Sequence, residues 1–371
     1  MMNRKPLRVM VVDDTVLYRK IVSDALATLP DVEVVGSAHN GKAAITKLAS
    51  LKPDLLTLDI EMPEINGLEV LEHIHQHAPQ IGAIMLSTLT REGGAMTMKA
   101  LELGAFDFIP KPQTGTMAEN RKKIESAIAP MIRAFQRSAR ISGILKTAPR
   151  PGKTAIIPAA GKTSASSLHM LRTPFKHSKA EIIAIGISTG GPNALAKMLP
   201  MIPGNIGVPI VIVQHMPPMF TQSLANSLAS KCAISVREAK QGEPLLPNTA
   251  FIAPGGKQMK IVAAADGKNR IINITDDPPE NSCKPSADYL FRSVAHHYVG
   301  RSTGVIMTGM GSDGTQGLKL LKKNGATIIA QNEATCVVFG MPKEAAETGL
   351  ADAVVALNQI AGMIVKTVRV G

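Results

Sequence analysis

The chain has 371 residues, of which 45% are hydrophobic and only 3% aromatic, and its formal net charge at pH 7 is +12. This length exceeds what a single hydrophobic core usually serves, so we expect at least two domains. No apolar run is long enough to span a membrane, no signal-peptide pattern precedes the first strand-like run, and the three cysteines are unpaired in spacing. We therefore expect a cytoplasmic protein with no direct membrane insertion.

The excess positive charge is concentrated in residues 116–180, where Glu119 and Glu125 are the only acids among many Lys and Arg residues. Residues 143–180 contain no acid and are rich in Pro, Ser, Thr and Lys, which is typical of a linker. We predict a domain over 1–140, a flexible basic linker over 141–180 and a second domain over 181–371. Because the predicted domains are nearly neutral and show no helix-turn-helix pattern, no DNA partner is expected.

The N-terminal region alternates apolar, strand-like runs with helical patterns. The runs end at Asp13, Val35, Asp59, Ser87 and Ile109. Strands that alternate with helices predict a doubly wound parallel α/β sheet.

Polar side chains gather where these predicted strands end. Asp13 and Asp14 follow the first run, Asp59 the third, Ser87 the fourth and Lys111 the fifth. Parallel strands share one carboxyl edge, where ligands bind, and converging carboxylates repel unless a hard cation such as Mg²⁺ lies between them. Single acids at strand ends often serve as helix caps, but this combination favours a site that accepts a phosphoryl group.

Residues 7–115 resemble the receiver domain of two-component response regulators, and Lys111-Pro112 matches that family's usual junction. The resemblance implies a flavodoxin-like parallel sheet, Mg²⁺ as cofactor and a histidine kinase as phosphodonor. It also implies roles for individual residues: phospho-acceptor Asp59, metal ligands Asp13, Asp14, Asp59 and the backbone of Glu61, switch hydroxyl Ser87 and phosphate contact Lys111.

A second α/β region begins at Ile182. Its clearest predicted strands are 182–187, 208–213, 304–308 and 326–330, which predict another doubly wound sheet. Residues 250–274 instead show short strands joined by turns, so we expect an antiparallel insertion there.

The run Gly186-Ile187-Ser188-Thr189-Gly190 is a G-x-S-x-G sequence, which fits either a nucleophile elbow or a glycine loop that binds phosphate. His215 directly follows another buried-looking run, and Asp313 follows a third within the loop GMGSDG. All three would lie on one sheet edge, so they are candidates for a Ser-His-Asp hydrolase. Their order differs from Ser-Asp-His, the usual order in α/β-hydrolases.

A rival interpretation takes residues 309–314 as a G-x-G-x-x-G dinucleotide-binding turn, with Glu333 as the ribose acid. Asp313 beside the pyrophosphate and the short chain after Gly314 count against it. A response regulator with a dinucleotide-binding or non-catalytic scaffold output domain is the alternative. Cys283 has no evident histidine partner in the sequence, so we interpret it as a buried or incidental thiol.

The blocks GISTGGP, VQHMP, AKQGE, IAPGG, MTGMGSDG and FGMPKEA resemble, in order, the chemotaxis response-regulator protein-glutamate methylesterases. The resemblance implies a phosphorylation-regulated hydrolase that removes methyl esters from glutamates on the cytoplasmic helices of chemoreceptors and also deamidates receptor glutamines. The resemblance also implies that Ser188, His215 and Asp313 are the catalytic residues and that the Met310 backbone N–H is a candidate donor to the oxyanion. It implies no cofactor at this second site. We hypothesise that the unphosphorylated receiver covers the cleft at Ser188.

Overall fold

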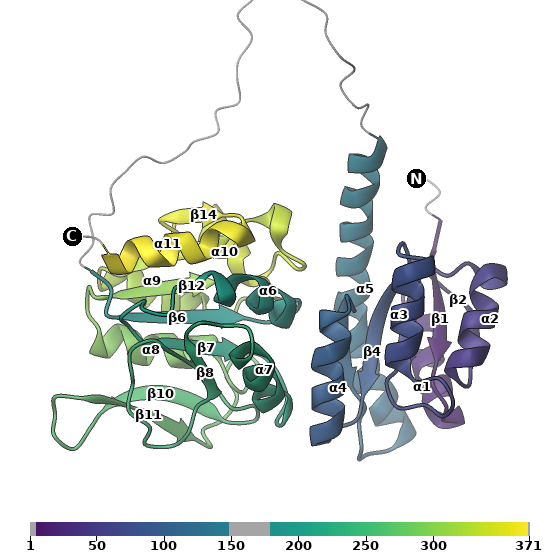
Figure 1. Ribbon diagram of the computed structural model, residues 1–371, viewed down its shortest axis with the longest axis horizontal. Coiled ribbons are helices and arrows are strands. Elements are labelled where there is room, and N and C mark those ends of the chain that lie inside the picture. The colour runs from purple at the N-terminus through teal and green to yellow at the C-terminus, as the bar shows by residue number, and fades with distance from the viewer. Residues whose placement is uncertain (1–4, 148–178, 370–371) are drawn as a thin grey trace, which may run out of the picture.

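The chain folds into two α/β units, shown in the computed structural model of Figure 1, which describes residues 5–147 and 179–369. The first unit has a parallel sheet of five strands in the order β2-β1-β3-β4-β5. This order confirms the flavodoxin-like doubly wound sheet, with the switch in direction between β1 and β3. Its strands are β1 (Leu7–Val12), β2 (Val32–Ala38), β3 (Leu55–Asp59), β4 (Gly82–Ser87) and β5 (Asp107–Pro110).

Five helices cover the two faces of this sheet: α1 (Val16–Ala27), α2 (Gly41–Leu51), α3 (Gly67–His77), α4 (Arg91–Glu102) and α5 (Met117–Thr147). Strands β3 and β4 are buried almost throughout, as expected for central strands that helices cover on both sides. Local sequence sets the helix starts, since Asn66 and Glu69 form a capping box at α3.

Two boundaries differ from the sequence prediction. Strand β2 continues to Ala38 rather than Val35, because an edge strand is only half buried and its polar residues hide the pairing with β1. Helix α5 continues to Thr147 and so enters the segment expected to be linker. Residues 148–178, the rest of that predicted linker apart from its last two residues, lie outside the described residues.

The second unit contains a seven-stranded parallel sheet in the order β14-β13-β12-β6-β7-β9-β8. Its strands are β6 (Ile182–Ile187), β7 (Ile210–Gln214), β8 (Ser235–Glu238), β9 (Thr249–Ile252), β12 (Ser302–Ile306), β13 (Thr327–Gln331) and β14 (Ala353–Val355). Its helices are α6 (Gly191–Met198), α7 (Phe220–Ala229), α8 (Ala287–His297), α9 (Thr315–Lys323), α10 (Met341–Glu347) and α11 (Leu357–Arg369), with 3₁₀ turns at Leu199–Met201 and Glu333–Thr335.

The antiparallel insertion is present as a hairpin of β10 (Gln258–Ala263) and β11 (Arg270–Thr275). The start of the predicted insertion instead forms β9, which joins the parallel sheet. Strands β8 and β14 are short and partly exposed, so the apolar pattern did not predict them. Among the described residues, no helix is both long and apolar enough to cross a membrane.

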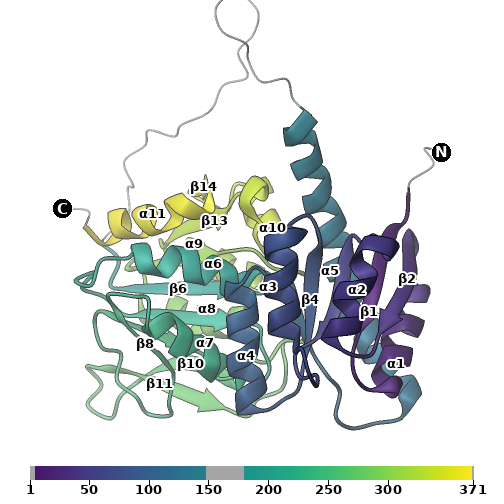
Figure 2. The same ribbon diagram turned by 45° about the vertical axis from the view of Figure 1, so that its right-hand side comes forward.

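The two units meet where α4 of the first packs on α6 and α7 of the second (Figures 1 and 2). Glu102 in α4 accepts a hydrogen bond from Ser227 in α7 and pairs with Lys231, whose Nζ lies 2.5 Å from its Oε1. The ring of Phe108 in β5 stacks on Phe220 with 4.8 Å between centroids. This contact joins β5 of the first unit to the start of α7 in the second.

Candidate active site and receiver site

The strand-end acids of the first unit converge around one lysine. Lys111 Nζ lies 2.8 Å from Asp13 Oδ2 and 2.7 Å from Asp59 Oδ2, with all three side chains buried. Burial raises the pKa of Asp59 to about 6, although the nearby Lys111 ammonium opposes this. Burial alone lowers the pKa of Lys111, but Asp59 and Asp13 raise it overall, so the ammonium stays charged.

The same edge can hold a hard cation. One oxygen from each of Asp13, Asp14 and Asp59 lies within 4.8 Å of the others, and Asp14 is exposed. The Glu61 backbone N–H donates to Asp59 Oδ1 at 3.4 Å, which brings the residue 61 backbone beside this carboxylate. Oxygen donors with excess negative charge suit Mg²⁺, so the residues fit the ion that receiver domains generally bind.

Ser87 lies at the end of β4, beside the acidic edge, but its hydroxyl faces α4. Ser87 Oγ donates to the carbonyl of Gly93 at 3.2 Å and accepts from Thr97 Oγ1 at 2.8 Å. The predicted switch hydroxyl is therefore held by the same helix that packs on the second unit.

Ser188 occupies a tight turn between β6 and α6. Its backbone N–H donates to Thr308 at 3.0 Å, and its carbonyl accepts from Gly191 N–H at 2.7 Å. Gly190 has a φ of 73°, in the left-handed region that favours glycine. A Cβ on Gly191 would lie 1.9 Å from Oε1 of the buried Gln214, so glycine allows the turn to pack this closely. This geometry favours the strand-to-helix elbow for Ser188.

His215 directly follows β7, whose neighbour in the sheet is β6. Ile187 pairs with Gln214 in the register of the two strands, and the His215 N–H donates to the Ile187 carbonyl at 3.1 Å. Ser188 and His215 are therefore the next residues of two adjacent parallel strands, which lie about 5 Å apart. Within the described residues, no hydrogen bond joins Ser188 Oγ to the imidazole, and such bonds often tighten only when substrate binds.

Asp313 lies in the loop after β12, the other neighbour of β6, and is buried. Its Oδ2 lies 2.8 Å from His215 Nε2 and accepts the Ala287 N–H at 2.6 Å. Its Oδ1 accepts from Ser286, Asn281 and Asp288. Burial alone raises the pKa of Asp313, but these contacts, with His215 foremost, hold it at about 2. The carboxylate is ionised, and its many donors fix it in place.

The neighbours of the His215 imidazole change its pKa. Burial alone lowers the pKa of His215, but the hydrogen bond to Asp313 and the contact with Cys283 raise it to about 9. In the neutral ring, Nε2 must carry the hydrogen, because an ionised carboxylate can only accept. The lone pair of Nδ1 is then the basic position.

Backbone donors for an oxyanion are present near Ser188. In the described part of the chain, the N–H groups of Met310 and Thr189 donate to no protein oxygen. A Cβ on Gly309 would lie 2.8 Å from Ser188 Cβ, so the loop carrying Met310 packs directly against the serine. Free donors beside the nucleophile are what an oxyanion requires.

The structure corrects the interpretation of Cys283 as a thiol without a histidine partner. Cys283 Sγ lies 3.7 Å from His215 Nδ1, and the side chain is partly exposed. The contact was hidden from the sequence because residue 283 belongs to the segment between the β10–β11 hairpin and α8, which returns over the sheet edge.

The loop at 309–314 does not favour the dinucleotide interpretation. Its carboxylate is hydrogen-bonded to His215 and lies just before Gly314, the N-cap residue of α9. A phosphate there would meet the buried charge of Asp313.

The receiver-type unit also reaches the elbow. Asp107, the first residue of β5, accepts the Gly190 N–H on its Oδ2 at 3.1 Å. The Asn193 side chain donates to the Ala105 carbonyl at 3.2 Å. The turn that carries Ser188 is therefore in direct contact with the first unit.

A receiver-type sheet edge and a hydrolase-type sheet edge joined in one chain define the class: a response regulator with an enzymatic output domain. Family models agree, since the response regulator receiver domain matches residues 9–122 and the CheB methylesterase model matches residues 183–364.

Full-length relatives identify the family. A protein-glutamate methylesterase/protein-glutamine glutaminase of Desulfotalea psychrophila is 57% identical over 98% of this chain and 99% of its own length. One from Trichodesmium erythraeum is 42% identical over 97% of this chain and 99% of its own. The chain belongs to the family of protein-glutamate methylesterase/protein-glutamine glutaminase response regulators. The crystal structure of the Thermotoga maritima CheB methylesterase catalytic domain is 40% identical, covers 51% of this chain and 99% of that chain, and has a TM-score of 0.49.

Proposed function

We propose that this chain hydrolyses methyl esters on glutamate side chains of chemoreceptors and deamidates receptor glutamines, under control of receiver phosphorylation. The substrates are segments of the receptors' cytoplasmic helices, and a histidine kinase supplies the phosphoryl group. Full-length similarity to relatives named for both activities supports the reaction class. The observation that carries the proposal is that Ser188 and His215 directly follow the neighbouring strands β6 and β7, and that the loop after β12 brings Asp313 to His215.

In the first half of the reaction, Ser188 Oγ attacks the γ-carbonyl carbon of the substrate. His215 Nδ1 takes the serine proton, and Asp313 holds the ring through Nε2 and stabilises the positive charge that forms. The carbonyl oxygen becomes an oxyanion, which the Met310 N–H and an N–H of the elbow stabilise. Collapse of this intermediate breaks the bond to methoxide, or to the amide nitrogen, and His215 returns the proton so that methanol or ammonia leaves.

In the second half, water hydrolyses the ester formed between Ser188 and the substrate. His215 accepts a proton from the water as its oxygen attacks the carbonyl carbon, and then returns a proton to Ser188 Oγ. The products are a free glutamate side chain and the original serine. The reaction requires no group beyond these side chains and the backbone donors.

The receiver edge supplies the regulation. Asp59 accepts the phosphoryl group and Lys111 contacts its oxygens. The side chains of Asp13, Asp14 and Asp59 and the Glu61 backbone would hold Mg²⁺. The ion, when bound, neutralises charge on the phosphoryl oxygens. Ser87 turns toward the phosphate and leaves its contacts with α4, which loosens the helix that packs on α7. The unphosphorylated receiver thus restrains the elbow, and phosphorylation shifts the equilibrium toward an open arrangement.

The test is methanol release from methylated receptor membranes, with and without a small-molecule phosphodonor. Wild type responds to the donor. Ser188→Ala releases no methanol in either condition, with a loss of at least about 10⁴-fold. Asp59→Ala retains basal release but gains nothing from the donor. Release by Ser188→Ala at the wild-type rate contradicts the serine mechanism, and equal rates with and without donor for wild type contradict the switch.

A further inference from the structure

A thiol lies next to the basic nitrogen of the histidine. Cys283 Sγ is 3.7 Å from His215 Nδ1, and one ligand atom from each of Cys283, His215 and Asp313 lies within 4.8 Å of the others. We propose that Cys283 and His215 bind a thiophilic divalent cation such as Zn²⁺, which inhibits the hydrolase by occupying the catalytic imidazole.

The spacing fits a metal held between the two atoms. Zinc bonds to thiolate sulfur at about 2.3 Å and to imidazole nitrogen at about 2.05 Å, so a tetrahedral angle places the two ligand atoms about 3.6 Å apart. The observed 3.7 Å requires little movement of either side chain. The thiol proton leaves as the bond to the metal forms, and water fills the remaining positions.

Asp313 supplies the outer support that such a site needs. Metal-binding histidines commonly donate their other ring N–H to a carboxylate, which fixes the tautomer and aims the free nitrogen at the metal. His215 Nε2 already pairs with Asp313 Oδ2 at 2.8 Å, so Nδ1 is the nitrogen that faces Cys283. The negative charges of the thiolate and of Asp313 together balance a divalent cation.

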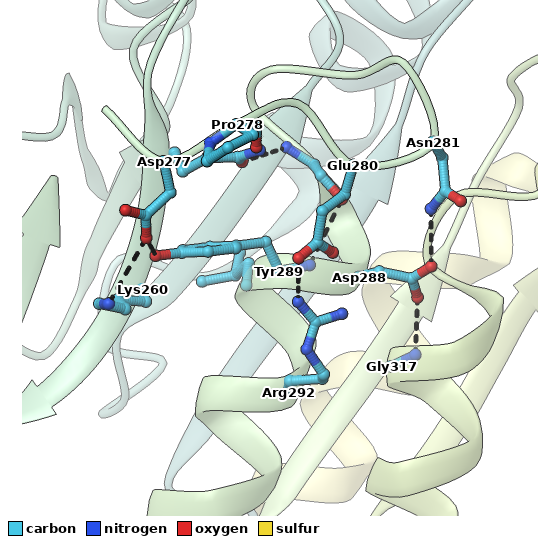
Figure 3. A network of polar contacts seen from close by, with 12 residues as sticks. Lys260, Asp277, Pro278, Glu280, Asn281, Asp288, Tyr289, Arg292 and Gly317 are labelled. Carbon is cyan, nitrogen blue, oxygen red and sulfur yellow. Dashed lines mark hydrogen bonds and ion pairs between the residues drawn. The ribbon is translucent and has the colours of Figure 1, made fainter. Parts of the chain in front are cut away.

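Hydrogen bonds and an ion pair hold the turn that carries Cys283, and Figure 3 shows those of its residues Glu280 and Asn281. Glu280 and Cys283 exchange backbone hydrogen bonds, and the Glu280 side chain pairs with Arg292 of α8. The Asn281 side chain donates to Asp288 at 2.9 Å, and Asp288 in turn accepts the Gly317 N–H. A fixed turn keeps the sulfur beside the imidazole and lowers the entropic cost of binding a metal.

The other two cysteines provide a built-in comparison. Burial raises the pKa of Cys232 to about 11, and burial raises that of Cys336 to about 12. Neither belongs to a group of three metal-binding side chains in the described part of the chain. A thiol that resists ionisation is a poor metal ligand, so these two cysteines are not expected to bind. Cys283 is the cysteine expected to bind because its Sγ lies beside His215 Nδ1.

Inhibition follows from the proposed function, on which this part of the inference rests. The metal would occupy His215 Nδ1, the nitrogen that takes the proton of Ser188. Metal binding itself does not depend on that mechanism, so the two can be measured separately.

The experiment titrates the full-length protein, stripped with EDTA, with Co²⁺ and follows the thiolate-to-cobalt charge-transfer band in the near ultraviolet. Wild type and a Cys232→Ser/Cys336→Ser double variant show the band, and Zn²⁺ displaces it. Cys283→Ser and Cys283→Ala lack it and bind Zn²⁺ at least about tenfold more weakly. A band of equal strength and equal Zn²⁺ affinity in the Cys283 variants overturns the site.

Methanol release is measured on the same samples. Zn²⁺ inhibits wild type and the double variant reversibly with EDTA, and at least about tenfold more Zn²⁺ is needed for either Cys283 variant. Equal sensitivity of all variants overturns inhibition at this site. If neither wild type nor any variant releases methanol, the proposed hydrolase activity is wrong, and the cobalt band still tests the metal site.

Discussion

Asp107 connects the receiver-type unit to the elbow of the hydrolase, and its charge should weaken that connection. The carboxylate is buried, with one oxygen accepting the Gly190 N–H at 3.1 Å and the other accepting the Phe108 N–H at 2.9 Å. Replacement by asparagine keeps an oxygen that can accept from Gly190 but removes the charge. We therefore expect Asp107→Asn to favour the docked arrangement.

The magnitude follows from the pKa of this carboxyl. Burial raises it from 3.8 to about 6, against the two hydrogen bonds that lower it. For an acid with a raised pKa, the docked state is penalised at pH values above 6, and the penalty disappears as the pH falls toward 3.8. A pKa raised from 3.8 to about 6 means that the charged carboxylate destabilises the docked state at pH 7 by at most about 3 kcal/mol. That ceiling applies if all the burial of Asp107 comes from docking.

The assay is basal methanol release at pH 7 without phosphodonor. Asp107→Asn should lower the basal rate by several-fold, with a limit of about 100-fold, and should increase the ratio of activated to basal rate. Asp24→Asn, on helix α1 and away from the second unit, is the matched control and should leave both rates unchanged. A basal rate for Asp107→Asn equal to or above wild type refutes the reasoning.

Three further predictions concern the elbow and its partners. Asp313→Asn should lower kcat by about 10⁴-fold without unfolding the protein, because the amide no longer fixes the tautomer of His215; a loss below tenfold contradicts the role. In EDTA, kcat/KM should rise with pH to a plateau above about 9, because His215 must be neutral to act as the base. Burial lowers the pKa of His215, but Asp313 and Cys283 raise it to about 9 overall. A plateau already reached near pH 7 would contradict this raised pKa. Gly191→Ala should lower the melting temperature, because the added Cβ would lie 1.9 Å from Gln214 Oε1. Gly362→Ala, in α11 with open space around it, is the control and should leave stability unchanged or raise it by up to about 1 kcal/mol. Equal melting temperatures for the two variants would contradict the close packing of the turn.

Much of the fold could be predicted because its signals are local. Buried parallel strands have continuous apolar runs, and β3, β4, β6 and β13 follow theirs closely. Edge elements such as β8 and β14 could not be predicted, since short and partly exposed strands depend on pairing partners far along the chain rather than on their own composition.

The part of the candidate site that lies directly at strand ends could also be predicted. Ser188 and His215 directly end central strands, and all parallel strands end at one edge, so their sequence positions already place them together. The sequence alone therefore determined the two sheets, the acids at the receiver edge and the serine and histidine of the second site.

Tertiary structure decided the contacts that depend on strand order and on the paths of loops. The order β12-β6-β7 brings Asp313 to His215, although its loop runs well beyond the end of β12. The segment that leads from β11 to α8 returns over the edge and places Cys283 beside the same ring, and docking of the two units joins Asp107 to Gly190. Such contacts join residues 68 to 98 positions apart, and packing of the whole chain sets them, so no local pattern of residues records them.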